Sequence, residues 1–265
     1  ERDITLVVND NKDAMLNFVV ERKGKEHKLS VKPVQSLEDE IFRVGLWVRD
    51  SIVGVGTMTF IDPDTNSFGA LGHGITDIDS GVLVDISKGS IMKSKVASVQ
   101  KARKTVPGEI VGIFYENDES YGKISKNTNF GIYGSLGNGN RRDKRQAIPI
   151  ALSYQVKEGP AKILSTINGS KVESFDIEIQ KINHQNSPDS KSMLIKVTDK
   201  KLLQETGGIV QGMSGSPIIQ DGRLVGAVTH VLVNDPTRGY GIFIEWMLDE
   251  ANIPLQSSLQ EASGQ

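Results

Sequence analysis

The feature that most constrains this chain is a small-residue turn followed by two apolar runs, in the segment 212–233, which reads GMSGSPIIQDGRLVGAVTHVLV. Two glycines flank Ser214 and allow the backbone to bend sharply there. The pair Asp221-Gly222 separates the two apolar runs and is a strong signal for a tight hairpin turn. This segment therefore predicts a β-hairpin whose entry turn presents one serine.

Short apolar runs recur at regular spacing from residue 41 onward, which is typical of an all-β barrel. Asn168-Gly169, between two of these runs, is a further hairpin signal. One late helix is expected at about 243–252, before Pro254. The fold class predicted is all-β, with a double β-barrel and a C-terminal helix. The predicted strands are 45–48, 53–60, 81–84, 110–115, 148–156, 161–167, 174–181, 193–197 and 225–233.

Three segments are expected along the chain: residues 1–40, a main domain at 41–254 and a polar tail at 255–265. In the first, 11–16 predicts a short helix, and the alternating runs 17–22 and 27–32 predict a hairpin. This hairpin resembles the last strands of a PDZ domain; the alternative is a simple terminal hairpin packed on the main domain. Because the chain begins without Met, a processed or truncated form is expected.

Composition removes several classes of function. The chain has no cysteine, which excludes disulfides, thiol nucleophiles and thiolate metal sites, and its net charge of -2 gives no sign of general nucleic-acid binding. No apolar stretch approaches the roughly 18 residues that cross a membrane. The glycine-rich segment 69–81 lacks a phosphate-binding lysine motif, and the histidines lack ligand spacing. No metal or other cofactor is expected.

A serine hydroxyl becomes a nucleophile when a base takes its proton. Of the four histidines, His73 is the best candidate base. It lies in a small-residue turn, Gly72-His73-Gly74, well before Ser214. A histidine early in the chain and a serine late is the order of chymotrypsin-like enzymes. The sequence therefore predicts His73 as the base for Ser214.

The third member of a triad should lie between His73 and Ser214. Spacing alone favours Asp118. The alternative interpretation of Asp199, which follows a predicted strand, is a loop acid or a helix cap. The full set of candidates is Asp118, Asp176, Asp199 and the neutral Asn129.

The backbone around the serine suggests how a substrate would be held. An oxyanion hole would use the N–H groups of Gly212 and Ser214. Gly208 is at a position that often forms the floor of the main side-chain pocket, and it carries no charge to select Lys or Arg. The strand around Thr229 would line the cleft and pair with the substrate backbone.

Two motifs together indicate a family. The segments 69–77 (GALGHGITD) and 207–217 (GGIVQGMSGSP) resemble the stage IV sporulation protein B peptidases, and 45–50 resembles the start of their catalytic domain. The resemblance covers about residues 41–254. It implies a secreted signalling serine endopeptidase that acts between the membranes around the forespore and is membrane-associated through segments outside this chain. Its protein substrate would be a regulator of a membrane-embedded metalloprotease, whose release triggers sigma-factor processing, and it would also cleave itself.

The resemblance also implies roles for individual residues. His73 would be the base, Ser214 the nucleophile and Asp199 the acid, in preference to Asp118. A PDZ domain would precede the catalytic domain. A second hypothesis of another class is a catalytically silent protease fold that serves as a scaffold or interaction protein.

Overall fold

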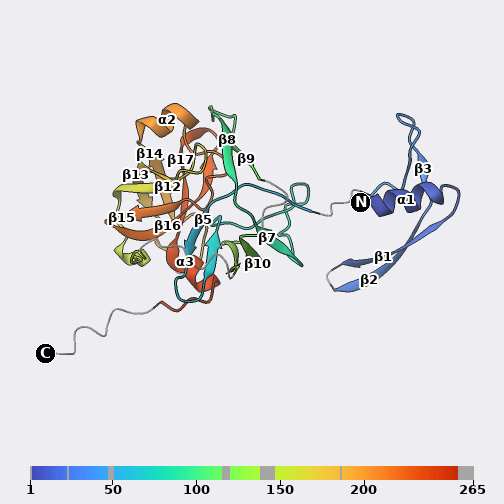
Figure 1. Ribbon diagram of the computed structural model, residues 1–265, viewed down its shortest axis with the longest axis horizontal. Helices are drawn as coiled ribbons and strands as arrows, with labels where there is room; N and C mark the ends of the chain where they lie inside the picture. Colours follow the sequence, from blue (N-terminus) through green and yellow to red (C-terminus); the bar gives the residue numbers. More distant parts are fainter. Residues whose placement is uncertain are drawn as a thin grey trace. The chain divides into compact units, whose positions relative to one another are not determined.

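The structure is a computed structural model that describes residues 2–22, 24–46, 51–114, 120–137, 147–185 and 187–255 (Figure 1). Internal contacts divide the chain into two units, 1–54 and 55–265. The predicted boundaries at residues 40 and 254 stay predictions. The predicted strand 45–48 lies partly outside the described residues, as does the tail. No helix among the described residues has the length and apolarity that a bilayer span requires.

The first unit contains a helix and two small antiparallel sheets. The predicted hairpin is confirmed, with strand partners running from Leu16↔Val31 to Arg22↔Lys25. The short helix predicted at 11–16 is wrong. The helix lies earlier, and at its end both the backbone nitrogen and the side-chain amide of Asn11 donate to the carbonyl of Val7, at 3.2 and 2.9 Å. The PDZ interpretation stays a prediction. The elements are α1 (Arg2–Asp10), β1 (Leu16–Arg22), β2 (Lys25–Val31), β3 (Val34–Gln35) and β4 (Phe42–Arg43).

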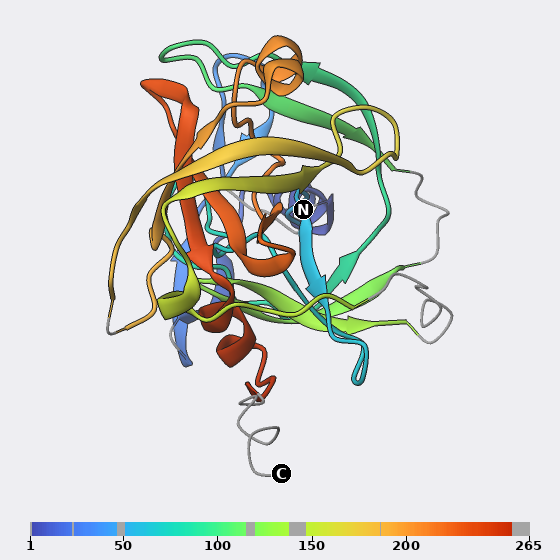
Figure 2. The ribbon, with the colours of Figure 1, turned by 90° about the vertical axis from the view of Figure 1, so that its left-hand side faces the viewer.

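In the second unit, six antiparallel strands form a closed barrel in the order β12-β13-β14-β17-β16-β15. The yellow-to-orange strands of this barrel curve around one another in Figure 2. The barrel and the high strand content confirm the predicted all-β class. The strands are β12 (Gly159–Ser165), β13 (Glu173–Ile182), β14 (Met193–Val197), β15 (Pro217–Gln220), β16 (Arg223–Leu232) and β17 (Asp235–Phe243).

The barrel follows from strict alternation in the sequence. On β13, Phe175, Ile177 and Ile179 are buried at 2% exposure or less, while the residues between them face outward. The hairpin turn predicted at Asp221-Gly222 is present, with positive φ angles of 50° and 74° that match a tight two-residue turn. The Asn168-Gly169 signal joins β12 and β13 as predicted, but through a longer loop, because the pairing ends at Ser165↔Glu173.

The other half of the second unit is a five-stranded sheet, in the order β5-β6-β11-β10-β7, with a separate hairpin β8-β9. Of the predicted strand 53–60 only the end is a strand, 81–84 forms a single bridge, and 148–156 contains a 3-10 turn, η2 (Ser153–Gln155). The strands are β5 (Met58–Ile61), β6 (Ser67–Ala70), β7 (Gly89–Ile91), β8 (Lys95–Gln100), β9 (Glu109–Ile113), β10 (Gly122–Thr128) and β11 (Gly131–Leu136).

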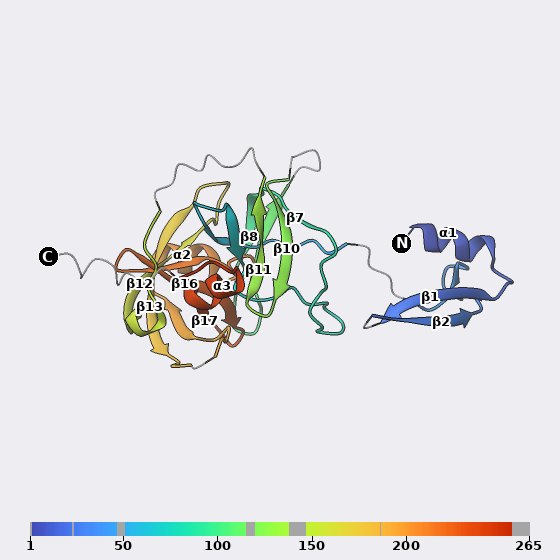
Figure 3. The same cartoon turned by 90° about the horizontal axis from the view of Figure 1, so that it is seen from below.

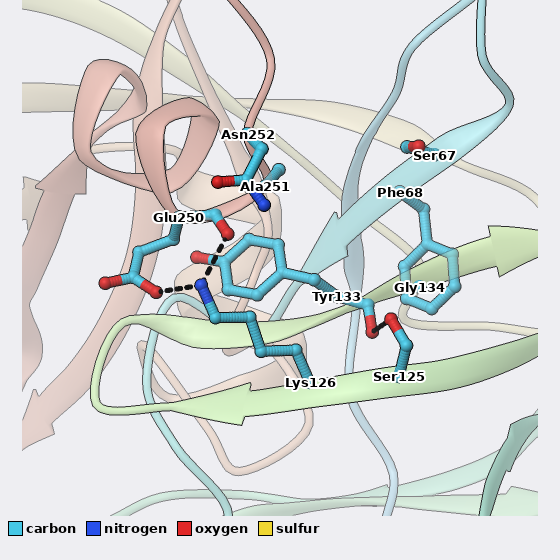
Figure 4. A pocket seen from close by; sticks show the side chains of 9 residues that line it. All are labelled: Ser67, Phe68, Ser125, Lys126, Tyr133, Gly134, Glu250, Ala251 and Asn252. Atoms are coloured by element: carbon cyan, nitrogen blue, oxygen red, sulfur yellow. Dashed lines mark hydrogen bonds and ion pairs between the residues drawn. The ribbon is translucent and has the colours of Figure 1, made fainter.

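Two helices complete this unit, α2 (Lys200–Thr206) and α3 (Ile244–Glu250), of which α3 is the predicted late helix. In Figure 3, α3 lies between the barrel and the strands β10 and β11. Its Met247 and Leu248 share one apolar cluster with Tyr133 of β11. Lys126 of β10 donates to the backbone carbonyl of Glu250 at 2.8 Å and pairs with its carboxylate at 2.9 Å (Figure 4). The helix therefore joins the two halves.

Candidate active site

The loop that carries Ser214 is bent by two glycines with positive φ, 95° at Gly212 and 90° at Gly215. A Cβ on Gly215 would lie 2.0 Å from the carbonyl oxygen of Thr57 and 2.5 Å from the nitrogen of Leu71. Only glycine fits at that position, because both neighbours are backbone. The Met213 side chain is fully buried, so the loop is fixed from both sides and Ser214 stays half-buried beside it.

Two backbone donors of this loop are free. Within the described part of the chain, the N–H groups of Gly212 and Ser214 have no hydrogen-bond partner. Their neighbours do: the nitrogen of Met213 donates to the carbonyl of Val210 at 3.1 Å, and that of Gly215 to Val228 at 2.8 Å. Two free donors beside a serine are what an oxyanion hole requires.

The serine hydroxyl is turned toward strand β16. Ser214 Oγ donates to the carbonyl oxygen of Thr229 at 2.9 Å. Thr229 is buried, and its own hydroxyl donates to the carbonyl of Ser190 at 2.7 Å, just before β14. Strand β16 therefore passes directly beside the candidate nucleophile.

His73 follows β6 in a turn that approaches the same strand. Leu71 and Gly72 both have φ angles of 70°. A Cβ on Gly72 would lie 2.9 Å from the methyl carbon of Thr229 and 3.1 Å from a methyl carbon of Ile242. The glycine therefore lets the histidine loop contact the barrel next to the residue that binds Ser214 Oγ.

The imidazole of His73 is held by its own loop. Its Nδ1 lies 2.9 Å from the carbonyl oxygen of Gly74. Because a carbonyl can only accept, this contact favours the tautomer with the proton on Nδ1 and leaves Nε2 as a proton acceptor. No hydrogen bond joins Ser214 to His73 among the described residues. The structure therefore brings their loops together without forming the Ser-to-His hydrogen bond.

A second histidine lies beside the first. The rings of His73 and His230 have centroids 5.0 Å apart, at an interplanar angle of 38°. Desolvation by the surrounding protein lowers the pKa of His230 to about 4, and the charges of His73 and Lys191 act in the same direction against the opposing charge of Asp189. Part of the residue stays exposed, but the ring is neutral near pH 7.

Sequence reasoning did not select His230 as a site residue. The signal was present, because alternation along a strand places His230 on the face opposite Thr229, which is buried.

Asp199 is the N-cap of α2. Its carboxylate accepts from the backbone nitrogen of Leu202 at 2.9 Å and from that of Asp176 at 3.3 Å. It lies at the end of β14, whereas the start of β14 is the end near Thr229. The structure thus does not bring Asp199 to His73, whose Nδ1 instead contacts the carbonyl of Gly74.

The other candidates for the third position differ in their surroundings. Asp118 lies outside the described residues. Asp176 is exposed on β13 and pairs with a lysine at 2.6 Å. Asn129 is exposed in the turn between β10 and β11, and this turn does approach the histidine loop, since a Cβ on Gly74 would lie 2.5 Å from the carbonyl oxygen of Thr128.

Gly208 is buried rather than open to a cleft. Its φ is 137°, and a Cβ there would lie 2.1 Å from the carbonyl oxygen of Pro236. The glycine is required by this close approach of the β17 backbone. The structure therefore gives Gly208 a packing role, and its part in a substrate pocket stays a prediction.

Comparison with known proteins identifies the family of the chain. Residues 40–248 match the family described as SpoIVB peptidase S55. The chain belongs to the SpoIVB peptidase S55 family. Membership confirms the predicted enzyme class, a serine peptidase, and a peptidase acts on a protein substrate. No curated protein matches the chain.

Three solved structures align with part of the chain at TM-scores below 0.5. The active form of the Rv3671c protease from M. tuberculosis aligns over 61% of this chain and 74% of its own, at 14% identity and a TM-score of 0.37. The inactive form of the same protease aligns over 60% of this chain and 82% of its own, at 14% identity and a TM-score of 0.35. The HtrA-type protease AlgW with a decapeptide aligns over 88% of this chain and 54% of its own, at 9% identity and a TM-score of 0.40.

Proposed function

We propose that the chain is a serine endopeptidase in which Ser214 is the nucleophile and His73 the general base. The observation that carries this is the meeting of two loops at Thr229. Ser214 Oγ binds the carbonyl of Thr229, and Gly72, which precedes His73, packs against its side chain. The free N–H groups of Gly212 and Ser214 complete the set that acyl transfer needs.

The reaction follows from these groups. Ser214 Oγ exchanges its bond to Thr229 for one to Nε2 of His73, passes its proton to that nitrogen and attacks the scissile carbonyl carbon. The N–H groups of Gly212 and Ser214 bind the oxyanion that forms. His73 then protonates the leaving amine, and water, activated in the same way, cleaves the acyl-enzyme and regenerates the serine.

The role of Asp199 is part of the proposal. The family resemblance supports Asp199 as the triad acid, whereas its hydrogen bonds are those of a helix cap. In the arrangement we propose, the carbonyl of Gly74 orients the imidazole through Nδ1. Asp199 then supports the fold through α2, and its charge is dispensable for the proton transfer.

The biological setting is proposed from the family resemblance. The enzyme would be a secreted sporulation signalling protease between the forespore and mother-cell membranes. It would cleave itself and a regulator of a membrane-embedded metalloprotease. Membrane association would come from segments outside this chain, and the hairpin of the first unit would belong to a PDZ-like segment.

The test is intact mass spectrometry after incubation with a serine-directed fluorophosphonate. Wild type should gain one adduct, which Ser214→Ala should not. The matched control is Ser98→Ala, an exposed serine on β8, which should label like wild type. Labelling of Ser214→Ala at the wild-type rate would move the nucleophile to another residue.

One observation favours a second candidate, a catalytically silent scaffold. Ser214 Oγ is bound to the carbonyl of Thr229 rather than to His73, and His73 Nδ1 contacts a backbone carbonyl. A wild-type protein that acquires no adduct and cleaves no peptide, with its substrate protein present or absent, would support this alternative.

A further inference from the structure

Thr57, just before β5, makes three hydrogen bonds that connect both loops of the site. Its backbone nitrogen donates to the carbonyl of Ser214 at 2.9 Å, and its hydroxyl donates to the carbonyl of Gly212 at 3.0 Å. Its own carbonyl accepts from the nitrogen of Leu71 at 3.2 Å. One half-buried residue of the five-stranded half therefore contacts the serine loop twice and the histidine loop once.

The two contacts with the serine loop surround a single peptide group. The N–H of Ser214 belongs to the peptide between Met213 and Ser214. The peptides on either side of it end in the carbonyls of Gly212 and Ser214, and Thr57 binds both of these. Holding the two flanking peptides fixes the directions in which the chain enters and leaves the peptide between them, so that this peptide can turn only by opposite changes of Met213 ψ and Ser214 φ.

The serine loop needs this restraint because Gly212 makes its backbone flexible. Gly212 has a φ of 95°, and a glycine peptide reaches other orientations at little steric cost. An oxyanion hole depends on donors that already point at the developing charge. A loop with this freedom therefore needs a partner that fixes the direction of its N–H groups.

We infer that Thr57 is a positioning residue for the oxyanion hole and that its hydroxyl carries this role. The inference rests on the proposed function of Ser214. Thr57 does not touch the reacting atoms; it acts through the carbonyls of Gly212 and Ser214. Removal of the hydroxyl leaves Gly212 O without its partner and frees one of the two flanking peptides.

Thr59 provides a matched control on the same strand. Its hydroxyl donates to the carbonyl of Gly215 at 2.8 Å, and the residue is buried. That carbonyl belongs to the peptide between Gly215 and Ser216, which carries neither oxyanion donor. Thr59 thus makes the same kind of contact with the same loop, one step away from the donors.

The experiment uses the full chain and compares the wild type with Thr57→Val, Thr57→Ser and Thr59→Val. The rate constant for fluorophosphonate labelling of Ser214 is followed by intact mass, and thermal unfolding is measured in parallel. We expect Thr57→Val to slow labelling about tenfold to a hundredfold, below the cost of deleting an oxyanion donor outright. Thr57→Ser should label like wild type, and Thr59→Val should lose less than Thr57→Val at a similar unfolding temperature.

The outcomes separate this inference from the proposed function. Equal rates for Thr57→Val and wild type would overturn the role of Thr57 and leave Ser214 as the nucleophile. Equal losses of labelling rate in Thr57→Val and Thr59→Val would also overturn the role of Thr57, because they would indicate general loosening of the loop. A wild type that does not label would overturn the proposed function itself. If Thr57→Val does not fold, Thr57→Ala takes its place. Slow labelling of Thr57→Ala beside normal labelling of Thr57→Ser would then support the role of the hydroxyl. Equal labelling rates for Thr57→Ala and Thr57→Ser would contradict that role.

Discussion

The two halves of the second unit contribute one loop each to the site, but they are built differently. The barrel surrounds a large apolar cluster to which all six of its strands contribute, including Phe175, Met193 and Phe243. The five-stranded sheet has a small cluster whose fully buried members come from two strands, β6 and β11. The buried Met213 anchors the serine loop in the large cluster, whereas the histidine loop extends from the edge of the small one.

This difference indicates where the site is vulnerable. The serine loop is held by the barrel core and by Thr57 and Thr59. The histidine loop is held mainly where it meets other elements, through Gly72 against Thr229 and through the nitrogen of Leu71 bonded to Thr57. A change in the small cluster should therefore affect the distance between the catalytic groups before it affects the nucleophile loop.

The largest effect on stability is expected when a buried phenylalanine of either cluster is changed to alanine. Phe175 and Phe68 are both buried, at 2% and 0% exposure, so changing either to Ala should lower the free energy of unfolding by about 3–5 kcal/mol. Phe68 lies on β6, which leads directly into the histidine loop. We expect Phe68→Ala to slow labelling of Ser214 more than Phe175→Ala does, measured where both proteins are folded by circular dichroism. Equal rates would contradict the proposed weakness of the histidine side.

A smaller effect concerns the helix cap. Asn caps helices as well as Asp does, whereas Ala does not. Asp199→Ala should therefore lower the free energy of unfolding by about 1 kcal/mol. Asp199→Asn should lower it less, because its one amide oxygen can still cap Leu202 but its NH2 cannot accept from the nitrogen of Asp176. Because Gly74 rather than Asp199 binds the imidazole, Asp199→Asn should also keep most of the labelling rate. Loss of labelling in a folded Asp199→Asn would instead assign the carboxylate to the triad.

A further prediction concerns the pH dependence of stability. Folding lowers the pKa of His230 from 6.5 to about 4, so between these values the unfolded chain binds a proton that the folded chain does not. Stability should therefore fall as the pH drops through this window, and the fall should be smaller in His230→Gln. Denaturant unfolding at pH 7 and pH 5 measures this. Identical pH dependence in the two proteins would show that the ring is not desolvated.

The barrel half was the more predictable from sequence. Strand 193–197 matches β14, and 174–181 lies within β13, because alternating Ile, Phe and Val fill a core on one face. In the other half, β10 and β11 were missed. The two strands pair with each other as a hairpin, from Gly122↔Leu136 to Thr128↔Gly131. Their sequences, GKISKNT and GIYGSL, are rich in glycine and polar residues and therefore lack the apolar alternation that marks a strand.

The candidate site was predictable only in part. Ser214 and His73 were found because small-residue turns mark them, and the structure brings their loops to Thr229. The capping role of Asp199 was locally visible, since Asp199 precedes the helix and Gly207 follows it with a φ of 75°. Thr57 was not selected, because its role depends on tertiary contacts that no local pattern reports.

The central claim is that His73 and Ser214, one from each half, form the base and nucleophile. The most direct measurement compares the fluorophosphonate labelling rate of Ser214 in wild type, His73→Gln and His230→Gln by intact mass. The account predicts that His73→Gln loses labelling by a factor of at least about 10³, as removal of a triad member does, and that His230→Gln retains it. Normal labelling in His73→Gln, with loss in His230→Gln, would contradict it and assign the base to His230.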